Sequence, residues 1–563
     1  MAYFNLGHHR RAVTTTSKEA QLWFDRGLVW AYSFNVGEAG KCFERAAQHD
    51  PNCAMAFWGI AYATGPNYNK AWKFFDGQDL RLSIERADAA LARALELAPQ
   101  ATPVEEALIK AIAARFPPKD DISTTDFSAL DRAYADAMRP VYRQFGSDPD
   151  IAALFADALM CMTPRGLWDL DTGKPTGDHT IEARKVIESG MEQPQGRHHP
   201  ALCHLYIHAM EMSPYPELAL PAADRLRHLV PDGSHMLHMP THIDAAVGDY
   251  RRSIDSNHEA IVADDKYFAS GSASLVPGGS LAYTVYRMHY ICAKLYAAMM
   301  CGRFTDAMSA AEKLEEVIDA KLLSIQSPPM ADSVESFLAS KAHVLIRFGR
   351  WEEILRLELP TDRALYCATT ATVLYARGLA FSALGRIPEA EVARKEFEAA
   401  RLVVPESRLN SIPCKQVDVL GVASTMLEGE LEYRKGNYDI AFASLREAIR
   451  REDALPYSDP PPWMQPVRHA LGGLLLEQGR VEEAEILFRE DLGFAKDFPR
   501  RRAKLNNVWG LHGLYECFTR LGKFDEALFI KSAHDIAVAT ADVPITVSCY
   551  CRVSAVGKSH CCN

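Results

Sequence analysis

The chain has 563 residues, of which 48% are hydrophobic and 24% charged, and its formal net charge is −11 at pH 7. These are the proportions of an ordinary globular protein. The negative charge argues against a nucleic-acid-binding protein, which relies on phosphate contacts. The length allows several domains or one long repeat array.

The N-terminal segment and the cysteines indicate the cellular compartment. The first 20 residues contain no apolar core of signal-peptide length. The most apolar run, 53–63, is shorter than the roughly 20 residues that span a bilayer. Of the 13 cysteines, nine lie singly in helical patterns, which favours reduced, buried thiols over a disulfide framework. We therefore expect a cytoplasmic protein with no membrane segment.

Amphipathic helical patterns run through the whole chain, and almost no stretch alternates as a strand does. A helix that begins near Asn52 should end at Gly65-Pro66, and an aromatic-rich insert follows over 70–80. A helix pair is expected over about 126–162. The next segment, 163–180, is rich in glycine and proline and reads as a long irregular insert, a feature that is often functional in a compact array.

A short motif recurs along the chain: a glycine, a polar residue and a bulky residue, with an alanine three positions later. It occurs at 302–304, 385–387, 436–438, 479–481 and 522–524, with looser copies at 248–250 and 349–351 and an early version at 35–39. Glycine can end one helix in a left-handed conformation, and the alanine lets the next helix approach closely. The pattern resembles the tetratricopeptide repeat (TPR) superfamily, whose period is about 34 residues. The resemblance implies an all-α solenoid of helical hairpins with a few long loop insertions.

Histidines are concentrated between His198 and His242, where 8 of the chain's 19 lie. They are His198, His199, His204, His208, His228, His235, His238 and His242. His204, His208 and Glu211 recur at i, i+4 and i+7, which is one face of a helix. His238 and His242 repeat the four-residue step. Pro200 and Pro240 suit the first turns of two helices, so that both histidine faces could converge in the concave groove where a solenoid binds ligands.

The convergence predicts a transition-metal site, because imidazole suits copper, zinc and iron. The predicted ligands are His204, His208, His238 and His242, with His235 or His289 as a further ligand. Glu211 is the candidate catalytic residue as a general base, with the alternatives of a ligand or an acceptor that orients an imidazole. The competing interpretation is that these histidines cap helices, line the groove, hydrogen-bond each other or bind an acidic peptide.

Longer stretches also resemble a bacterial and fungal group of TPR proteins, which share H-P-x3-H-x2-I-H-x2-E-x-S-P and a loop ending in H-M-P-x-H-I. The matching residues are His199, Pro200, His204, His208, Glu211, Ser213, Pro214, His238, Met239, Pro240, His242 and Ile243. The stretches CAMAFWGIAYATGPNYN, PPPWMQPVR and SCYCR resemble the same group. The chain departs from it at 286–290, where the group tends to have H-N-x-H-F. The resemblance implies the fold and leaves the activity open.

We expect one continuous solenoid over 1–541, with a histidine-rich groove segment over 198–289, and a cysteine-containing tail over 542–563. In the tail, Cys549 and Cys551 form a candidate soft-metal pair or part of a disordered end. Cys561 and Cys562 are interpreted as exposed thiols of a disordered end.

Two functions from different classes remain open. The first is a metal-dependent enzyme that acts on a small molecule or peptide in the groove, in a biosynthetic pathway. The second is a non-catalytic scaffold that binds a partner protein or peptide. No glycine-rich phosphate loop, serine-hydrolase elbow or H-E-x-x-H sequence is present, so nucleotide chemistry and serine hydrolysis have no support.

Overall fold

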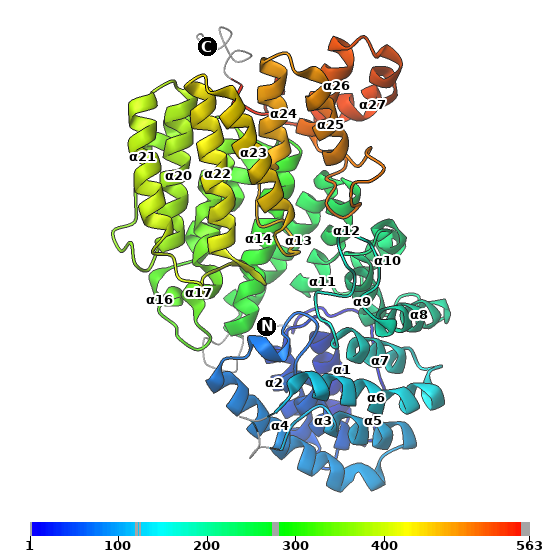
Figure 1. Cartoon of the computed structure of the whole chain (residues 1–563). Helices are drawn as coiled ribbons and strands as arrows, with labels where there is room; N and C mark the ends of the chain where they lie inside the picture. The colour runs from blue at the N-terminus through cyan, green and yellow to red at the C-terminus, as the bar shows by residue number, and fades with distance from the viewer. Residues whose placement is uncertain (1–2, 119–121, 123–124, 273–280, 553–563) are drawn as a thin grey trace. The chain divides into compact units, whose positions relative to one another are not determined.

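The computed structural model describes residues 3–118, 122, 125–272 and 281–552, and these are helical almost throughout (Figure 1). The strands among them are β1 (Leu409–Ser411) and β2 (Cys414–Lys415), one short antiparallel pair. The predicted all-α class is therefore confirmed. In the described part of the chain, no helix combines the length and the apolarity needed to cross a bilayer. Cys561, Cys562 and most of the 270–280 loop lie outside the described residues.

The chain divides into two compact units. The first comprises Met1–Ile243 and Ser256–Arg287, and the second comprises Asp244–Asp255 and Met288–Asn563. Three helices contribute residues to both units: α12 (Pro240–Val247), α13 (Tyr250–Ala269) and α14 (Leu281–Met300). One continuous solenoid over 1–541 stays a prediction.

Helices of the first unit pair in sequence order as antiparallel hairpins. The pairs are α1 (Lys18–Tyr32) with α2 (Val36–His49), α3 (Ala54–Thr64) with α4 (Gly77–Leu97), α5 (Pro103–Ala113) with α6 (Phe127–Phe145), α7 (Pro149–Met160) with α8 (Asp178–Glu192), and α9 (Pro200–Met210) with α10 (Leu220–Leu226). Short elements complete the unit: η1 (Trp72–Phe74), η2 (Ala98–Gln100), η4 (Pro216–Ala219) and α11 (Ser234–His238). The second helix of one hairpin packs on the first helix of the next, as α2 does on α3 and α8 on α9, which is the arrangement of a TPR-like solenoid.

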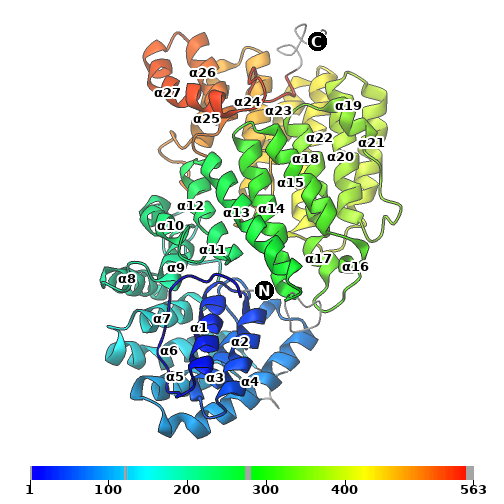
Figure 2. The same ribbon diagram turned by 180° about the vertical axis from the view of Figure 1, so that it is seen from behind.

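The second unit repeats this arrangement after a stretch of shorter elements. That stretch contains α15 (Phe304–Val317), α16 (Ala320–Leu323), α17 (Met330–Val334), η5 (Glu335–Ala339), α18 (Ser340–Arg347) and α19 (Trp351–Arg356). The hairpins are α20 (Cys367–Ala383) with α21 (Ile387–Arg401), α22 (Gln416–Arg434) with α23 (Tyr438–Asp453), α24 (Val467–Glu477) with α25 (Val481–Asp491), and α26 (Val508–Arg520) with α27 (Phe524–Thr540). Figures 1 and 2 both show α20 to α23 side by side.

Wherever the repeat motif occurs, it forms the turn between two successive helices, as its composition predicts. All seven of its glycines have φ between +64° and +85°, a region that side chains disfavour: Gly248, Gly302, Gly349, Gly385, Gly436, Gly479 and Gly522. The bulky residue two positions later begins the next helix, as Phe304 does for α15. In the first hairpin the same place is held by Phe34, whose φ is +54°. A left-handed non-glycine residue costs roughly 1–2 kcal/mol, so this phenylalanine requires a compensating contact.

Several predicted boundaries are confirmed. The helix expected from Asn52 is α3, and Gly65 caps its end. The pair α6 and α7 covers the stretch predicted at 126–162. The segment 163–177 has no helix, as expected of the insert.

Candidate metal centre

Three helices of the first unit carry the predicted histidine cluster. Helix α9 begins at Pro200. Proline is tolerated there because an N–H in the first turn has no acceptor within the helix. The same helix carries His204 and His208. Helix α11 carries His235 and His238, and α12 carries His242. The short link between α11 and α12 arises because Pro240 lacks the N–H that would continue the first helix. All five imidazoles are buried, with at most 4% of each residue exposed.

The imidazole nitrogens approach each other closely. The Nε2 atoms of His204 and His235 lie 3.1 Å apart, and those of His238 and His242 lie 3.0 Å apart. Ring nitrogens of His204, His208 and His235 all lie within 4.8 Å of one another. The rings of His208 and His242 are 5.7 Å apart at their centroids. The five predicted histidines on α9, α11 and α12 are thus brought together in one cluster.

Acceptors outside the cluster fix two of these rings through Nδ1. The Nδ1 of His204 lies 2.8 Å from the backbone oxygen of Tyr32. A carbonyl oxygen can only accept, so His204 carries its proton on Nδ1 and turns the Nε2 lone pair inward. His238 does the same through Oδ1 of Asn257, at 2.7 Å. This outer contact is the usual second partner of a metal-binding histidine.

Glu211 holds the other two rings in the same way. Its Oε1 lies 2.8 Å from Nδ1 of His208, and its Oε2 accepts from Nδ1 of His242. Burial alone would raise the pKa of Glu211, but the imidazoles of His242 and His208 hold it well below its usual range. The carboxylate is therefore ionised, and each of its oxygens accepts from an imidazole.

The imidazole nitrogens consequently face one another in two adjoining sets, His204 with His208 and His235, and His238 with His242. The Nε2 atoms of His238 and His242 lie 3.0 Å apart. If both present lone pairs, these repel each other unless a proton or a cation lies between the two nitrogens. Metal–nitrogen bonds of 2.0–2.1 Å in tetrahedral geometry place ligand nitrogens about 3.3 Å apart, close to the separations seen. The Nε2 of His208 has no hydrogen-bond partner among the described residues. Burial lowers the pKa of His204, His208 and His235, so the rings are neutral and able to act as ligands.

Phe34 contacts the cluster and was not anticipated from the sequence. Its ring lies 4.5 Å from that of His204, 5.9 Å from that of His208 and 5.3 Å from that of His235. The left-handed turn of the first hairpin directs the ring there. The sequence did contain a signal for it. Phe34 stands five residues before Ala39, and every later copy of the motif that has the alanine carries a glycine at the same distance before it.

Two tyrosines also line the cluster without having been predicted. The ring of Tyr68 lies 4.7 Å from that of His208, and the ring of Tyr286 lies 4.8 Å from that of His235. They come from the 65–69 loop and from α14, far from the histidines in sequence. The irregular insert supports the site from outside, since Trp168 Nε1 donates to the backbone oxygen of Ala209 in α9 at 2.7 Å.

A second group in the first unit, around Asp150, is saturated by protein contacts. Asp150 Oδ1 lies 3.0 Å from His199 Nε2 and 3.1 Å from His9 Nε2, and it accepts from the Tyr32 hydroxyl at 2.6 Å. Its other oxygen accepts from Arg11 at 3.1 Å. The His199 side chain also accepts a hydrogen bond from the backbone N–H of Leu202, so His199 is the N-cap of α9. This network anchors the start of α9 and Tyr32 and leaves little room for an ion.

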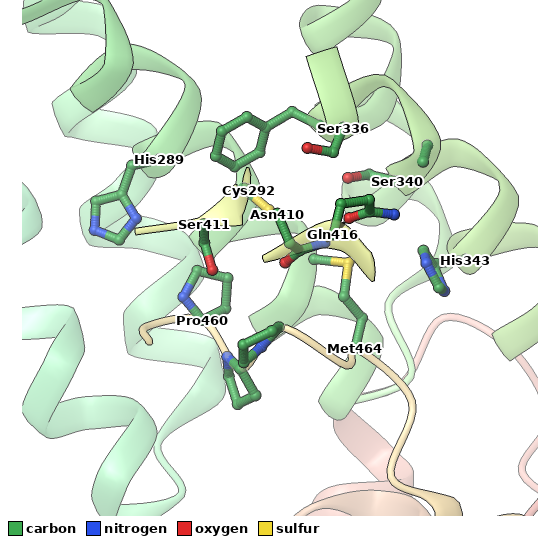
Figure 3. Close-up of a pocket in the computed structure, with 14 residues that line it drawn as sticks. His289, Cys292, Ser336, Ser340, His343, Asn410, Ser411, Gln416, Pro460 and Met464 are labelled. Atoms are coloured by element: carbon green, nitrogen blue, oxygen red, sulfur yellow. Dashed lines mark hydrogen bonds between the residues drawn. The ribbon is translucent and has the colours of Figure 1, made fainter. Parts of the chain in front are cut away.

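Two further histidines of the 198–242 segment, His198 and His228, are exposed. His289 belongs to the second unit, where it lines a pocket of about 450 Å³ of empty volume, and its role as a metal ligand stays a prediction. Figure 3 shows His289 on one side of this pocket and His343 on the other. Cys549 and Cys551 also belong to the second unit, beside a different pocket.

Comparisons with known proteins give little further guidance. No protein-family model matches the sequence, and no curated protein matches it significantly. Among solved structures the chain is similar to one titled "Structure of Naa15/Naa10 bound to HypK-THB", at 12% identity and a TM-score of 0.22. The match covers 93% of this chain and 71% of that chain. A similarity this weak says nothing about activity or ligands.

Proposed function

We propose that the first unit binds a transition-metal ion through the buried histidine cluster and that the chain is a metal-dependent enzyme. The observation that carries the proposal is the common orientation of four imidazoles. Each donates from Nδ1 to an acceptor outside the cluster and turns Nε2 toward the others. In a purely structural pair one imidazole would donate an N–H to the lone pair of the other, but at His238 and His242 both Nδ1 protons already go to outside acceptors.

The ligand set that fits best begins with His204, His208 and His235, whose nitrogens are mutually close. His242 and His238 lie beside this group and complete the shell. An all-nitrogen set favours zinc, copper or iron over magnesium or calcium, which prefer oxygen. The deep burial of every ring restricts access to a small molecule or to a single side chain of a peptide. When bound, the metal would supply Lewis-acid or redox chemistry.

Glu211 is assigned an orienting role in this proposal. Both of its oxygens accept hydrogen bonds from imidazoles, and its lowered pKa makes it a weak base. Its ionised form stabilises the Nδ1-protonated tautomer of His208 and His242, and thereby keeps both Nε2 atoms available to the metal.

Metal analysis of paired variants tests the proposal. Purified protein supplied with zinc, copper or iron should retain about one ion per chain, measured by mass spectrometry of the elements. The double variant His208→Ala/His242→Ala should lose the metal while keeping its helix content by circular dichroism. The matched control is His228→Ala, an exposed histidine of the same segment, which should keep the metal. A double variant that retains its metal would place the ion elsewhere and overturn the proposal.

The pocket beside His289 supports a second candidate, a scaffold that binds a polar, uncharged peptide segment. None of the described residues that line it is Asp, Glu, Lys or Arg, and the Asn410 side chain donates to Gln416 at 2.9 Å. Both amides could instead bond to a peptide backbone, and the buried Nδ1 of His343 has no partner among the described residues. If the chain is such a scaffold, protein supplied with zinc, copper or iron should retain no metal. The double variant Asn410→Ala/Gln416→Ala should then bind uncharged polar peptides at least tenfold more weakly than the parent.

A further inference from the structure

Cys549 and Cys551 follow the last helix and fold back against the helices of the second unit. The N–H of Arg552 donates to the backbone oxygen of Cys549 at 3.1 Å, which closes a tight turn around the two cysteines. They line a pocket of about 470 Å³ of empty volume. Its other walls include a buried cation, a buried carboxyl and apolar side chains: Arg347, Glu430, Ile346, Trp351, Leu379 and Met426.

The two sulfurs have different surroundings. The Cys549 Sγ accepts a hydrogen bond from the N–H of Cys551 at 3.4 Å. The Cys551 Sγ lies 3.9 Å from the backbone oxygen of Ala470, a group that can only accept from it. A donated N–H favours a thiolate, and an accepting carbonyl favours a thiol. The geometry therefore separates one nucleophilic sulfur from one protonated sulfur.

A buried guanidinium, that of Arg347, lines the same pocket as the Cys549 sulfur. Arg347 is 3% exposed and forms no ion pair with a carboxylate among the described residues. It donates to the oxygen of Ser548 at 2.8 Å and to Nδ1 of His469 at 3.0 Å. His469 in turn donates to Asp491 at 2.7 Å. The imidazole of His469 therefore stands between this carboxylate and the Arg347 guanidinium, and the two do not bond directly. Burying a cation this deeply is costly without an anion nearby, and the Cys549 thiolate can be that anion.

The other charged groups leave the thiolate favoured. Arg434 donates to the backbone oxygen of Cys551 and lies 4.0 Å from Glu477. Burial raises the pKa of Glu430 to about 8, so this carboxyl is largely neutral at pH 7 and does not repel a thiolate. Hydrogen bonding with Cys551, which includes its backbone N–H, and the charge of Arg347 together outweigh burial and lower the pKa of Cys549 to about 7.

We propose that Cys549 and Cys551 form a thiol–disulfide exchange site for small disulfides with apolar substituents. The Cys549 thiolate attacks one sulfur of the substrate, forming a mixed disulfide and releasing the first thiolate. Cys551 then loses its proton to water and attacks the Cys549 sulfur, releasing the second thiolate. The cysteine pair is oxidised by two electrons to a disulfide, and the substrate is reduced to two thiols. Residues i and i+2 of a tight turn lie within the Cα separation that a disulfide accepts.

Stoichiometric reaction of the reduced, full-length chain with 4,4′-dithiodipyridine tests the assignment. Cys561 and Cys562 are replaced by serine in every sample, so that they cannot contribute. At pH 7 the parent chain should rapidly release two equivalents of thiopyridone. Cys551→Ser should release one equivalent and retain a mixed disulfide at Cys549, identified by peptide mass spectrometry. Cys549→Ser should release none rapidly.

Controls separate this site from other thiols and from the metal centre. Cys367→Ser removes a buried cysteine of the same unit and should behave as the parent. His208→Ala/His242→Ala should also behave as the parent, so that failure of the metal proposal leaves this one standing. The rate of the first release should rise with pH about a midpoint near 7 rather than near 9. Rapid release that survives in a folded Cys549→Ser chain, or two equivalents from Cys551→Ser, would overturn the proposal.

Discussion

Phe34 combines a strained backbone angle with contacts to three imidazoles, which suggests that its ring, rather than the turn, is the reason for its presence. Replacing it with glycine relieves roughly 1–2 kcal/mol of left-handed strain and removes the ring that packs on His204, His208 and His235. Loss of a buried phenylalanine side chain costs about 3–5 kcal/mol, so we expect Phe34→Gly to lower the free energy of unfolding by only about 1–4 kcal/mol and to weaken metal binding about tenfold. Urea unfolding and chelator competition measure the two effects. An unchanged metal affinity in Phe34→Gly would mean that the Phe34 ring does not support the metal site.

Glu211 offers a test of orientation as distinct from ligation. Glutamine at this position keeps one acceptor oxygen but turns an NH₂ group toward the other imidazole, which must then change tautomer. Loss of such an outer partner typically costs 10–100-fold in metal affinity, and we expect that loss for Glu211→Gln. The control is Glu217→Gln, an exposed carboxylate six residues later. Chelator competition on both folded variants measures the difference, and equal affinities would contradict the orienting role.

At the scale of elements, hairpins stack closely because a ring of one helix fits against glycines of its two neighbours. Phe488 of α25 packs against Gly472 of α24 and Gly513 of α26, and a Cβ at Gly513 would meet its ring at 2.3 Å. We expect Gly513→Ala to lower the free energy of unfolding by about 1–3 kcal/mol through overpacking. Gly421→Ala, also within a helix but with only Arg451 nearby at 3.4 Å, should be neutral or slightly stabilising. Urea unfolding compares the two.

Rescue makes the prediction specific to the ring. In the Gly513→Ala background, Phe488→Leu should recover part of the lost stability because the smaller side chain makes room for the new methyl group. If Phe488→Leu instead adds its full cost to that of Gly513→Ala, the clash is not the cause.

What the sequence predicts at this scale is local to one helix or one turn. The repeat glycines predict the hairpin turns, and the four-residue steps predict which histidines share a face, because helical periodicity fixes both. The acceptors Tyr32 and Asn257 and the aromatic residue Tyr68 could not be predicted, since they come from other hairpins. Periodicity carries no information about which hairpins meet.

At the scale of the whole molecule, the division into two units was not predicted from the sequence. The glycine motif is distributed unevenly: its copies from 248–250 to 522–524 all lie in the second unit, and the first unit has only the early version at 35–39. Helical periodicity is the same in both units, so periodicity alone does not show where one unit ends.

Acid should destabilise the whole chain through histidines that are buried in the neutral form. Burial lowers the pKa of His343 to about 4, whereas an exposed histidine in the unfolded chain titrates near 6.5. Between these values the unfolded state binds a proton that the folded state excludes. Stability is therefore complete above about pH 6.5 and is lost as the pH falls toward 4. At about 1.4 kcal/mol per unit of pKa, the full loss of stability from this one residue is about 3.5 kcal/mol.

His343→Leu removes this contribution and also removes a buried Nδ1 that has no hydrogen-bond partner among the described residues. The variant should lose less stability than the parent between pH 7.5 and pH 5, when urea unfolding is measured at both values. His258→Leu replaces an exposed histidine and should leave the parent's pH dependence unchanged. A parallel loss of stability in the parent and in His343→Leu would mean that His343 is already protonated in the folded chain. In that case its pocket would have to supply an acceptor that compensates for burial.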